Sequence, residues 1–272
     1  MSTMNVSERH GWVRFRRARN AALAEPHGWL TLTSLQWLDG ESRRVADVPG
    51  RWSVTDDTAT LIATPDDALT ELTTGQVVDG MITASLDDEE SLLWVGYGGA
   101  SGRRVVVELA RRAGRYALRT RDAEAPAFTD FGGVPVFDYQ PDYVVGGHFL
   151  PYDASVDEPI RTANPQVAGM HRTVGEIVFQ LPGNPTEHRL HATREQDGSL
   201  SVTFHDRTNG TTTAGWRKLS IARPQADGSV LLDFNRAINY PSAFTPYGTC
   251  PMPVEANVVA AAVEAGERAP RR

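Results

Sequence analysis

Apolar and polar residues alternate over short runs along most of the chain, a pattern typical of β-strands. In the first half the runs are WLTLTSLQWL, RWSVT, ATLIAT, SLLWVGY, RRVVVELA and RYALRT. In the second half they are DYVVGGHFL, GEIVFQL, HRLHATR, LSVTFHD, GWRKLSIA and SVLLDFN. The pattern predicts a mainly β fold with two β lobes, each barrel- or sandwich-like.

Two stretches depart from this alternation and predict helices. Residues 7 to 24 place Trp12 and Phe15 near one face, which indicates an N-terminal helix. Residues 254 to 267 follow Pro253 and carry an apolar stripe, which predicts a short C-terminal helix. The expected organisation is an N-terminal helix in 1–27, a first β lobe in 28–120, a Pro/Gly-rich connector in 121–142, and a second β lobe in 143–272.

Composition is that of an ordinary globular protein, with 40% hydrophobic and 22% charged residues among 272. The net charge of −7 argues against a general binder of nucleic acid or anionic membranes. The basic cluster Arg14, Arg16, Arg17 and Arg19 is expected to be a solvated helix face. The single cysteine excludes an intrachain disulfide and, with no apolar signal-peptide core at the N-terminus, favours a cytoplasmic location.

The most unusual stretch is DFNRAINYPSAFTPYGTCPMP, residues 233 to 253. It begins as a strand and then becomes irregular while remaining rich in aromatic, proline and polar residues. A surface loop seldom contains so much aromatic surface, so we expect this stretch to wall the principal small-molecule pocket, in the second lobe. Strand alternation would put Arg236 on the face of Leu232 and Phe234, and Asn235 on the other.

This stretch resembles the signature of an uncharacterised, mainly bacterial family catalogued as domain of unknown function 1684. The segment Phe204 to Gly210 is similar to the family's F-x-D-x-T-x-G, and Gly28-Trp-Leu to its opening motif. The resemblance covers nearly the whole chain and implies a shared fold without an established activity. The chain departs from the family pattern at Ser242, where a cysteine is usual, at Asn257-Val-Val, where Asn-Arg-Leu is usual, and at Trp216.

Strand parity gives a sharper expectation for two charged residues. Asp206 shares a strand face with Val202 and Phe204, and Arg217 shares one with Leu219. Both side chains therefore point toward apolar faces of neighbouring strands. Because a buried charge needs a partner, we expect Asp206 and Arg217 to be buried and to pair or to face one polar pocket.

Polar residues around this pair are the candidates for a site. An arginine can bind a carboxylate or phosphate, and a carboxylate can transfer protons. The candidate catalytic residues are Asp206, Arg217 and Tyr240, and the candidate ligand-binding residues are Thr208, Asn235, Arg236, Asn239, Phe244 and Cys250. The alternative is that these groups only satisfy backbone amides, and that Cys250 is a buried structural thiol.

No metal site and no cofactor are expected. The histidines His148, His171, His188, His191 and His205 are scattered along the chain, and a single cysteine cannot form a zinc-type cluster. The glycine-rich loops of dinucleotide and P-loop sites are absent from the sequence. A flavin in a barrel cleft stays open, because such sites have no compact signature.

Two functions remain. The first is a cofactor-independent enzyme, of hydrolase, lyase or cyclase type, that acts on a small organic molecule in a pocket of the second β lobe. The second is a non-catalytic small-molecule-binding protein that uses the same pocket. A pocket that contains a titratable residue with a shifted pKa beside a charged partner would favour the enzyme, and a purely apolar pocket would favour binding alone. A partner-binding protein with an exposed apolar patch is a third possibility.

Overall fold

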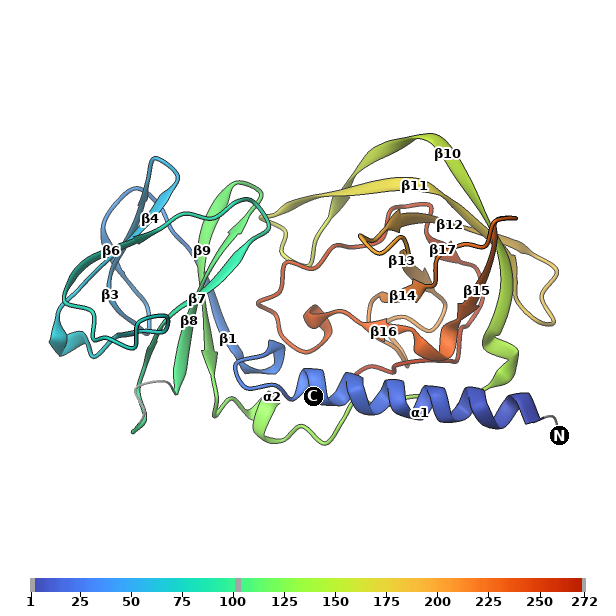
Figure 1. Ribbon diagram of the computed structural model, residues 1–272, viewed down its shortest axis with the longest axis horizontal. Helices are drawn as coiled ribbons and strands as arrows, with labels where there is room; N and C mark the ends of the chain where they lie inside the picture. Colours follow the sequence, from blue (N-terminus) through green and yellow to red (C-terminus); the bar gives the residue numbers. More distant parts are fainter. Residues whose placement is uncertain (1–2, 101–103, 271–272) are drawn as a thin grey trace. The chain divides into compact units, whose positions relative to one another are not determined.

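The computed structural model describes residues 3–100 and 104–270, and its fold is mainly β, as predicted (Figure 1). The chain divides into two compact units. Unit 1 combines residues 1–22 with 132–272, and unit 2 comprises Leu23–Phe131. The break between them follows Phe131, within the Pro/Gly-rich stretch.

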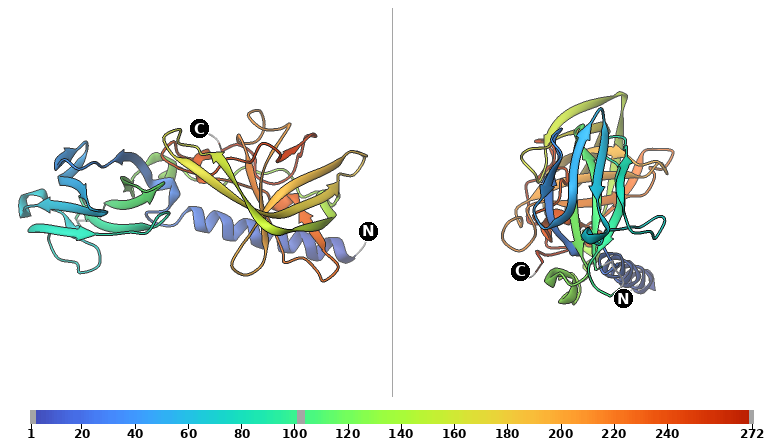
Figure 2. Two further views of the ribbon diagram at one scale, coloured as in Figure 1. Left: turned by 90° about the horizontal axis from the view of Figure 1, so that it is seen from above. Right: turned by 90° about the vertical axis from the view of Figure 1, so that its left-hand side faces the viewer.

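Unit 2 contains two antiparallel sheets, whose strand orders are β1-β9-β8-β7-β5 and β2-β3-β4-β6 (Figures 1 and 2). The elements of unit 2 are η1 (Trp29–Thr31), β1 (Leu32–Trp37), β2 (Arg43–Val45), β3 (Val48–Thr55), β4 (Thr58–Ala63), η2 (Pro65–Asp67), β5 (Thr70–Glu71), β6 (Gly80–Ala84), β7 (Ser91–Tyr97), β8 (Val105–Arg112), β9 (Arg115–Asp122) and α2 (Pro126–Thr129). Both sheets contribute to one core, in which Trp52 of β3 meets Trp94 of β7 edge to face at 5.6 Å.

Unit 1 contains the long helix α1 (Thr3–Leu23) and a curved sheet of order β15-β10-β11-β12-β13-β14-β16 (Figure 2). The elements after α1 are η3 (Pro141–Tyr143), β10 (Val144–Arg161), β11 (Ala168–Gln180), β12 (Glu187–Arg194), β13 (Leu200–Asp206), β14 (Arg217–Ile221), β15 (Ser229–Asp233), η4 (Phe234–Arg236), β16 (Ile238–Asn239), η5 (Pro241–Ala243) and β17 (Val258–Val259). The short strand β17 pairs with β13 in parallel.

The core of unit 1 lies on one face of this sheet, which we call the inner face. Phe234 contacts Phe179 of β11 and Phe204 of β13, with ring centroids 5.5 and 5.7 Å apart. Leu200 and Val202 join Phe204 on the same side of β13 and are fully buried. Alternation along the strands thus directs apolar side chains inward, and the opposite, outer face is left for polar residues.

Helix α1 ends one residue earlier than predicted and packs against the C-terminal part of unit 1 (Figure 1). Its Arg16 and Arg19 both pair with Glu267 at 3.1 Å, so the expectation that the basic cluster is a solvated face is wrong for these two residues. Trp12 donates from Nε1 to the carbonyl of Asn235 at 3.0 Å. No helix among the described residues is long and apolar enough to cross a membrane.

The predicted C-terminal helix over 254–267 is not formed. This segment is irregular apart from β17, and its carbonyls accept hydrogen bonds from the guanidinium of Arg217. Arg217 donates to the oxygens of Val263 and Ala265, and Asp206 accepts from the amide of Val263. The backbone groups that a helix would pair internally are therefore bonded to side chains of β13 and β14 instead.

The parity prediction for Arg236 is also wrong. Strand β15 ends at Asp233 and a 3-10 turn begins at Phe234, so the two-residue period no longer applies. Arg236 pairs with Asp233 at 2.9 Å and lies 5.5 Å from the ring of Phe15 in α1.

Candidate acid–base site

An irregularity in β11 gathers polar side chains on the outer face of the unit 1 sheet. Val174 packs against the core and Ile177 belongs to it, although an odd spacing should put them on opposite faces. Gly175 lies between them with φ +156°, opposite a register shift in β10. This bulge-like irregularity resets the alternation, so Thr173 and Glu176 both reach the outer face.

Only glycine fits at this position. A Cβ on residue 175 would lie 2.4 Å from the carbonyl oxygen of Leu150 and 2.7 Å from the ring of Phe149. The backbone of β10 and the side chain beneath it therefore require a residue without a side chain here.

The centre of the outer-face cluster is a hydrogen-bonded pair of His191 on β12 and Glu158 on β10. Nδ1 of His191 lies 2.8 Å from Oε1 of Glu158, and the side chains are 19% and 28% exposed. Since a carboxylate can only accept, Nδ1 carries the proton that is donated to Glu158. The other ring nitrogen, Nε2, is thereby left as the basic atom in the neutral imidazole.

The backbone of His191 is held by Asn257, which is fully buried. The amide of His191 donates to Oδ1 of Asn257 at 2.7 Å, and Nδ2 of Asn257 donates to the carbonyl of His191 at 3.0 Å. The same Nδ2 reaches the carbonyl of Thr203 in β13 at 2.8 Å. Asn257 thus fixes β12 beside β13 and sets the position of the imidazole.

Glu158 is held by a second chain of hydrogen bonds. The hydroxyl of Thr173 donates to Oε1 of Glu158, which leaves that hydroxyl free to accept from Nδ1 of His171 at 2.9 Å. Burial acts to raise the pKa of Glu158, but the bonds from Thr173 and His191 outweigh it and hold this pKa below its ordinary value. Glu158 is therefore an ionised carboxylate at neutral pH.

His171 differs in environment from His191. It is 7% exposed, and burial lowers the pKa of its imidazole, against the opposing effect of Glu158. His171 is therefore neutral at pH 7 and acts as a hydrogen-bond donor in the chain that ends at Glu158.

A second carboxylate faces the open side of His191. Oε1 of Glu176 lies 3.6 Å from Nε2 of His191, and the hydroxyl of Tyr152 donates to the same oxygen at 2.9 Å. Arg189 binds the other oxygen of Glu176 at 3.0 Å. Burial and the contact with Glu176 raise the pKa of Tyr152 to about 12, so its hydroxyl keeps its proton.

Taken together, these groups can perform acid–base chemistry. An imidazole with one fixed tautomer, an orienting carboxylate on Nδ1 and a partly exposed side chain is an arrangement suited to general-base catalysis. No group of three or more His, Cys, Asp or Glu side chains among the described residues has the geometry to hold a metal ion.

The predicted pair Asp206–Arg217 forms, and both side chains are buried as expected. Nη2 of Arg217 lies 2.7 Å from Oδ2 of Asp206, and both side chains are 0% exposed. Thr208 donates to Asp206 from its amide and from its hydroxyl. Burial lowers the pKa of Arg217, with Asp206 opposing the effect. The pair is closed to solvent, a placement that favours a structural role.

The other predicted site residues are spread over several places. Asn239 pairs with Arg217 across the sheet and donates to the carbonyl of Arg268, while Asn235 binds the backbone of Gln140. The hydroxyl of Tyr240 lies 2.5 Å from that of Thr203, and burial raises the pKa of Tyr240 to about 12. Cys250 is buried and Phe244 half-buried.

The outer-face cluster was not predicted from the sequence; it consists of Tyr152, Glu158, His171, Thr173, Glu176 and His191. Polar residues at every second position of β11 and β12 were its only signal, and Gly175 breaks that period. The pairing of Glu176 opposite His191 depends on strand register, which the sequence does not state.

Comparisons with known proteins place these residues in a family. A solution NMR structure of an uncharacterised protein from Haloarcula marismortui is 31% identical over 52% of this chain and 78% of its own, with a TM-score of 0.43. No curated protein matches the sequence. The model of the family described as "Protein of unknown function (DUF1684)" matches residues 129–268, just over half of the 272 and inclusive of the whole outer-face cluster. The chain therefore belongs to the DUF1684 family.

Proposed function

We propose that the protein is an enzyme that acts on a small organic molecule by acid–base chemistry of hydrolase, lyase or cyclase type, without a cofactor. The proposed catalytic residue is His191 in the second β lobe, oriented by Glu158. The observation that carries this proposal is the 2.8 Å bond from Nδ1 of His191 to Glu158 in a pair that solvent still reaches. A reducing cytoplasm is the proposed compartment, because the sequence holds a single cysteine.

In this reaction Nε2 of His191 removes a proton from a substrate or from a water molecule bound beside it. The imidazolium that forms is stabilised by Glu158 on Nδ1 and by Glu176, 3.6 Å from Nε2. His191 then returns the proton to the product or leaving group. General acid–base catalysis of this kind contributes about 10²- to 10⁴-fold in rate.

The hydrogen bonds around the pair support this assignment. Thr173 and His171 keep Glu158 ionised and in place, and Asn257 holds the backbone of His191 from the other side. A histidine that only packs would not need its tautomer fixed on one side and its backbone clamped on the other. We assign Thr173, His171 and Asn257 as positioning residues.

The test compares His191→Gln with the matched variant His205→Gln. His205 lies on β13, bonds the carbonyl of Gly215 and is outside the cluster. Each protein is incubated with a panel of esters, lactones and small organic acids and with a metabolite extract, and products are detected by mass spectrometry.

We expect product formation by the wild type and by His205→Gln, and a loss of about 100-fold or more in His191→Gln at an unchanged melting temperature. Equal turnover by the two variants would contradict the proposal. If no product depends on His191 but a compound from the extract is retained by the folded protein, the non-catalytic binding protein becomes the better account.

A further inference from the structure

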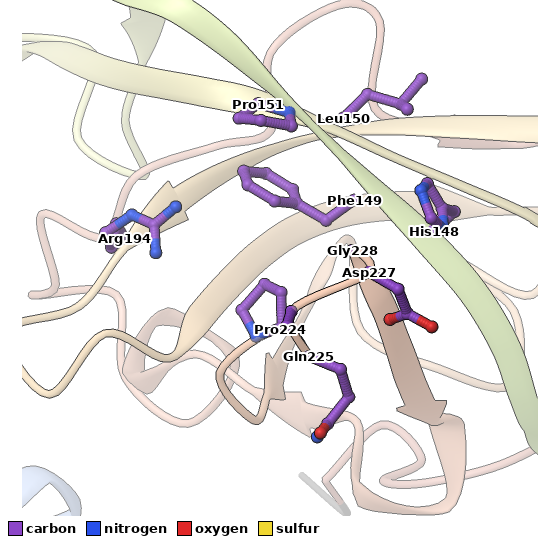
Figure 3. A pocket seen from close by; sticks show the side chains of 10 residues that line it. His148, Phe149, Leu150, Pro151, Arg194, Pro224, Gln225, Asp227 and Gly228 are labelled. Carbon is purple, nitrogen blue, oxygen red and sulfur yellow. The ribbon is translucent and has the colours of Figure 1, made fainter.

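Unit 1 has a cavity whose lining shares no residue with the outer-face cluster, although its Arg194 follows His191 by only three positions on β12 (Figure 3). Its volume is about 390 Å³, within the usual range for small-molecule sites. It is lined by His148, Phe149, Leu150, Pro151, Arg194 and the turn 224–228. None of the residues expected from the sequence to form a pocket lines it.

Arg194 gives the cavity a positive end. Its guanidinium carbon lies 5.5 Å from the centre of the Phe149 ring, and its only hydrogen bond to a described residue is a long one of 3.5 Å to the carbonyl of Gly198. Arg194 has no carboxylate partner among the residues that the structure describes. Its fork of N–H donors is therefore available to an anion, the group that a guanidinium binds best.

The walls beside Arg194 are apolar. Phe149 is 4% exposed and forms the floor, and Pro151 and Pro224 lie around it (Figure 3). The side chain of Leu150 points away from Phe149, so the apolar surface beside Arg194 comes from Phe149, Pro151 and Pro224. A ligand with a flat apolar body would cover this surface while its charged group meets Arg194.

The turn 224–228 closes the opposite end and is held by backbone hydrogen bonds. The amide of Gly228 donates to the carbonyl of Gln225, and the amide of Phe149 donates to the carbonyl of Gly228. Gly228 has φ +84°, and a Cβ there would lie 2.8 Å from Nε2 of His148. Asp227 stands at this end, with its carboxylate bound by the amide of Ser229 at 2.9 Å. The cavity is thus positive at Arg194 and negative at Asp227.

We propose that this cavity is a binding site for a small organic acid, with the carboxylate on Arg194 and an apolar ring over Phe149 and Pro224. The site is separate from the proposed catalytic pair, and it stands or falls independently of it. The charge at Asp227 repels an anion at the far end, so the ligand has one orientation, with its acidic group at Arg194.

The test uses benzoate as the probe, with benzamide and benzylamine as neutral and cationic probes of the same shape. Binding is followed by NMR shifts of the amides of Phe149, Arg194 and 225–228 in the full-length protein. The variants are Arg194→Gln, Arg194→Lys, and Arg207→Gln as a matched exposed arginine outside the cavity.

We expect saturable shifts at these amides with benzoate, and affinity roughly tenfold lower for benzamide, for benzylamine and for benzoate with Arg194→Gln. Arg194→Lys should recover part of the loss, and Arg207→Gln should bind as the wild type does. The proposal is overturned if benzoate gives no saturable shift, if benzamide or benzylamine binds as tightly, or if the Gln variants behave alike. Arg194 is exposed, so its replacement leaves the fold intact.

Discussion

Two pairs of polar side chains in unit 1 have nearly the same separation but different access to solvent. In the first, Arg217 and Asp206 lie 2.7 Å apart with both side chains 0% exposed. In the second, His191 and Glu158 lie 2.8 Å apart with 19% and 28% exposed. Arg217 also donates from its two terminal nitrogens to backbone carbonyls of the C-terminal segment, whereas Nε2 of His191 lies 3.6 Å from Glu176 on the outer face.

This difference separates holding a chain from acting on a ligand. A pair closed to solvent, with its bonds made to the protein itself, gives a substrate no access. A pair that solvent reaches is open to a substrate as well. The sequence motif that resembles the family signature leads to the first pair, whereas the proposed chemistry lies at the second.

Removing the buried arginine should have the largest effect. Arg217→Met leaves Asp206 charged and buried, so we expect the free energy of unfolding in urea to fall by about 3–5 kcal/mol. Arg161→Met, at an exposed arginine, should cost at most about 0.5 kcal/mol.

The double variant Asp206→Asn/Arg217→Met should cost less than the two single changes added together. If the losses of unfolding free energy are additive, the two charges do not stabilise each other, and Asp206 and Arg217 are not a structural pair to compare with His191 and Glu158.

The second-largest effect on stability is expected when Asn257, which holds the backbone of His191, is replaced. Asn257→Ala leaves the amide of His191 and the carbonyl of Thr203 without their partner, so we expect a loss of about 2 kcal/mol in the free energy of unfolding. The NMR signal of the Nδ1 proton of His191 should also shift or broaden. Asn164→Ala, which removes only local bonds in a loop, is the control, and an unchanged His191 signal would refute the clamp.

A smaller effect should appear as a dependence on pH. Burial places the pKa of His171 below its ordinary value of 6.5. As pH falls, His171 therefore becomes protonated in the unfolded chain at a higher pH than in the folded protein. The stability that neutral His171 contributes is present above pH 6.5 and is lost as pH falls through the lower folded pKa. His171→Gln should therefore lose less stability than the wild type between pH 7 and 5, measured as urea midpoints. Part of the slope should remain, because burial also lowers the pKa of His188. Equal slopes would count against a buried neutral His171.

The smallest effect on stability is expected at the partly exposed pair. Glu158→Gln should change the free energy of unfolding by less than about 1 kcal/mol, because water screens the interaction and the amide can still accept a bond. A loss as large as that of Arg217→Met would show that this pair is also structural, and the contrast between the two pairs would disappear.

Local patterns in the sequence predict the first pair well and the second not at all. Asp206 and Arg217 lie on adjacent strands with regular alternation, so a period of two is enough to turn both toward the core. Glu158 and His191 lie on strands separated by β11, and their meeting depends on strand register and on the irregularity at Gly175. Neither can be read from one strand at a time.

The helix predicted over residues 254–267 is wrong for a related reason. Its alanines, valines and glutamates favour a helix locally, but Arg217, Asp206 and strand β13 bind its backbone in an extended form. Tertiary contacts override propensity here. The prediction of a mainly β fold is correct because it depends on many strands, each of which shows its own alternation of apolar and polar residues.

The pairing of helix α1 with Glu267 has a consequence for how the protein is made. Unit 1 is discontinuous in sequence, since residues 23–131 lie between its two parts. During translation, unit 2 can fold before the second part of unit 1 is made, and the apolar side of α1 then has nothing to pack against. Glu267, the partner of both Arg16 and Arg19, is synthesised about 250 residues after them, so this loop of the chain can close only late in translation. A ribosome that stalls before residue 267 would hold a chain in which unit 2 is folded and α1 lacks its ion pairs with Glu267. Proteases and chaperones would have access to the helix in that state.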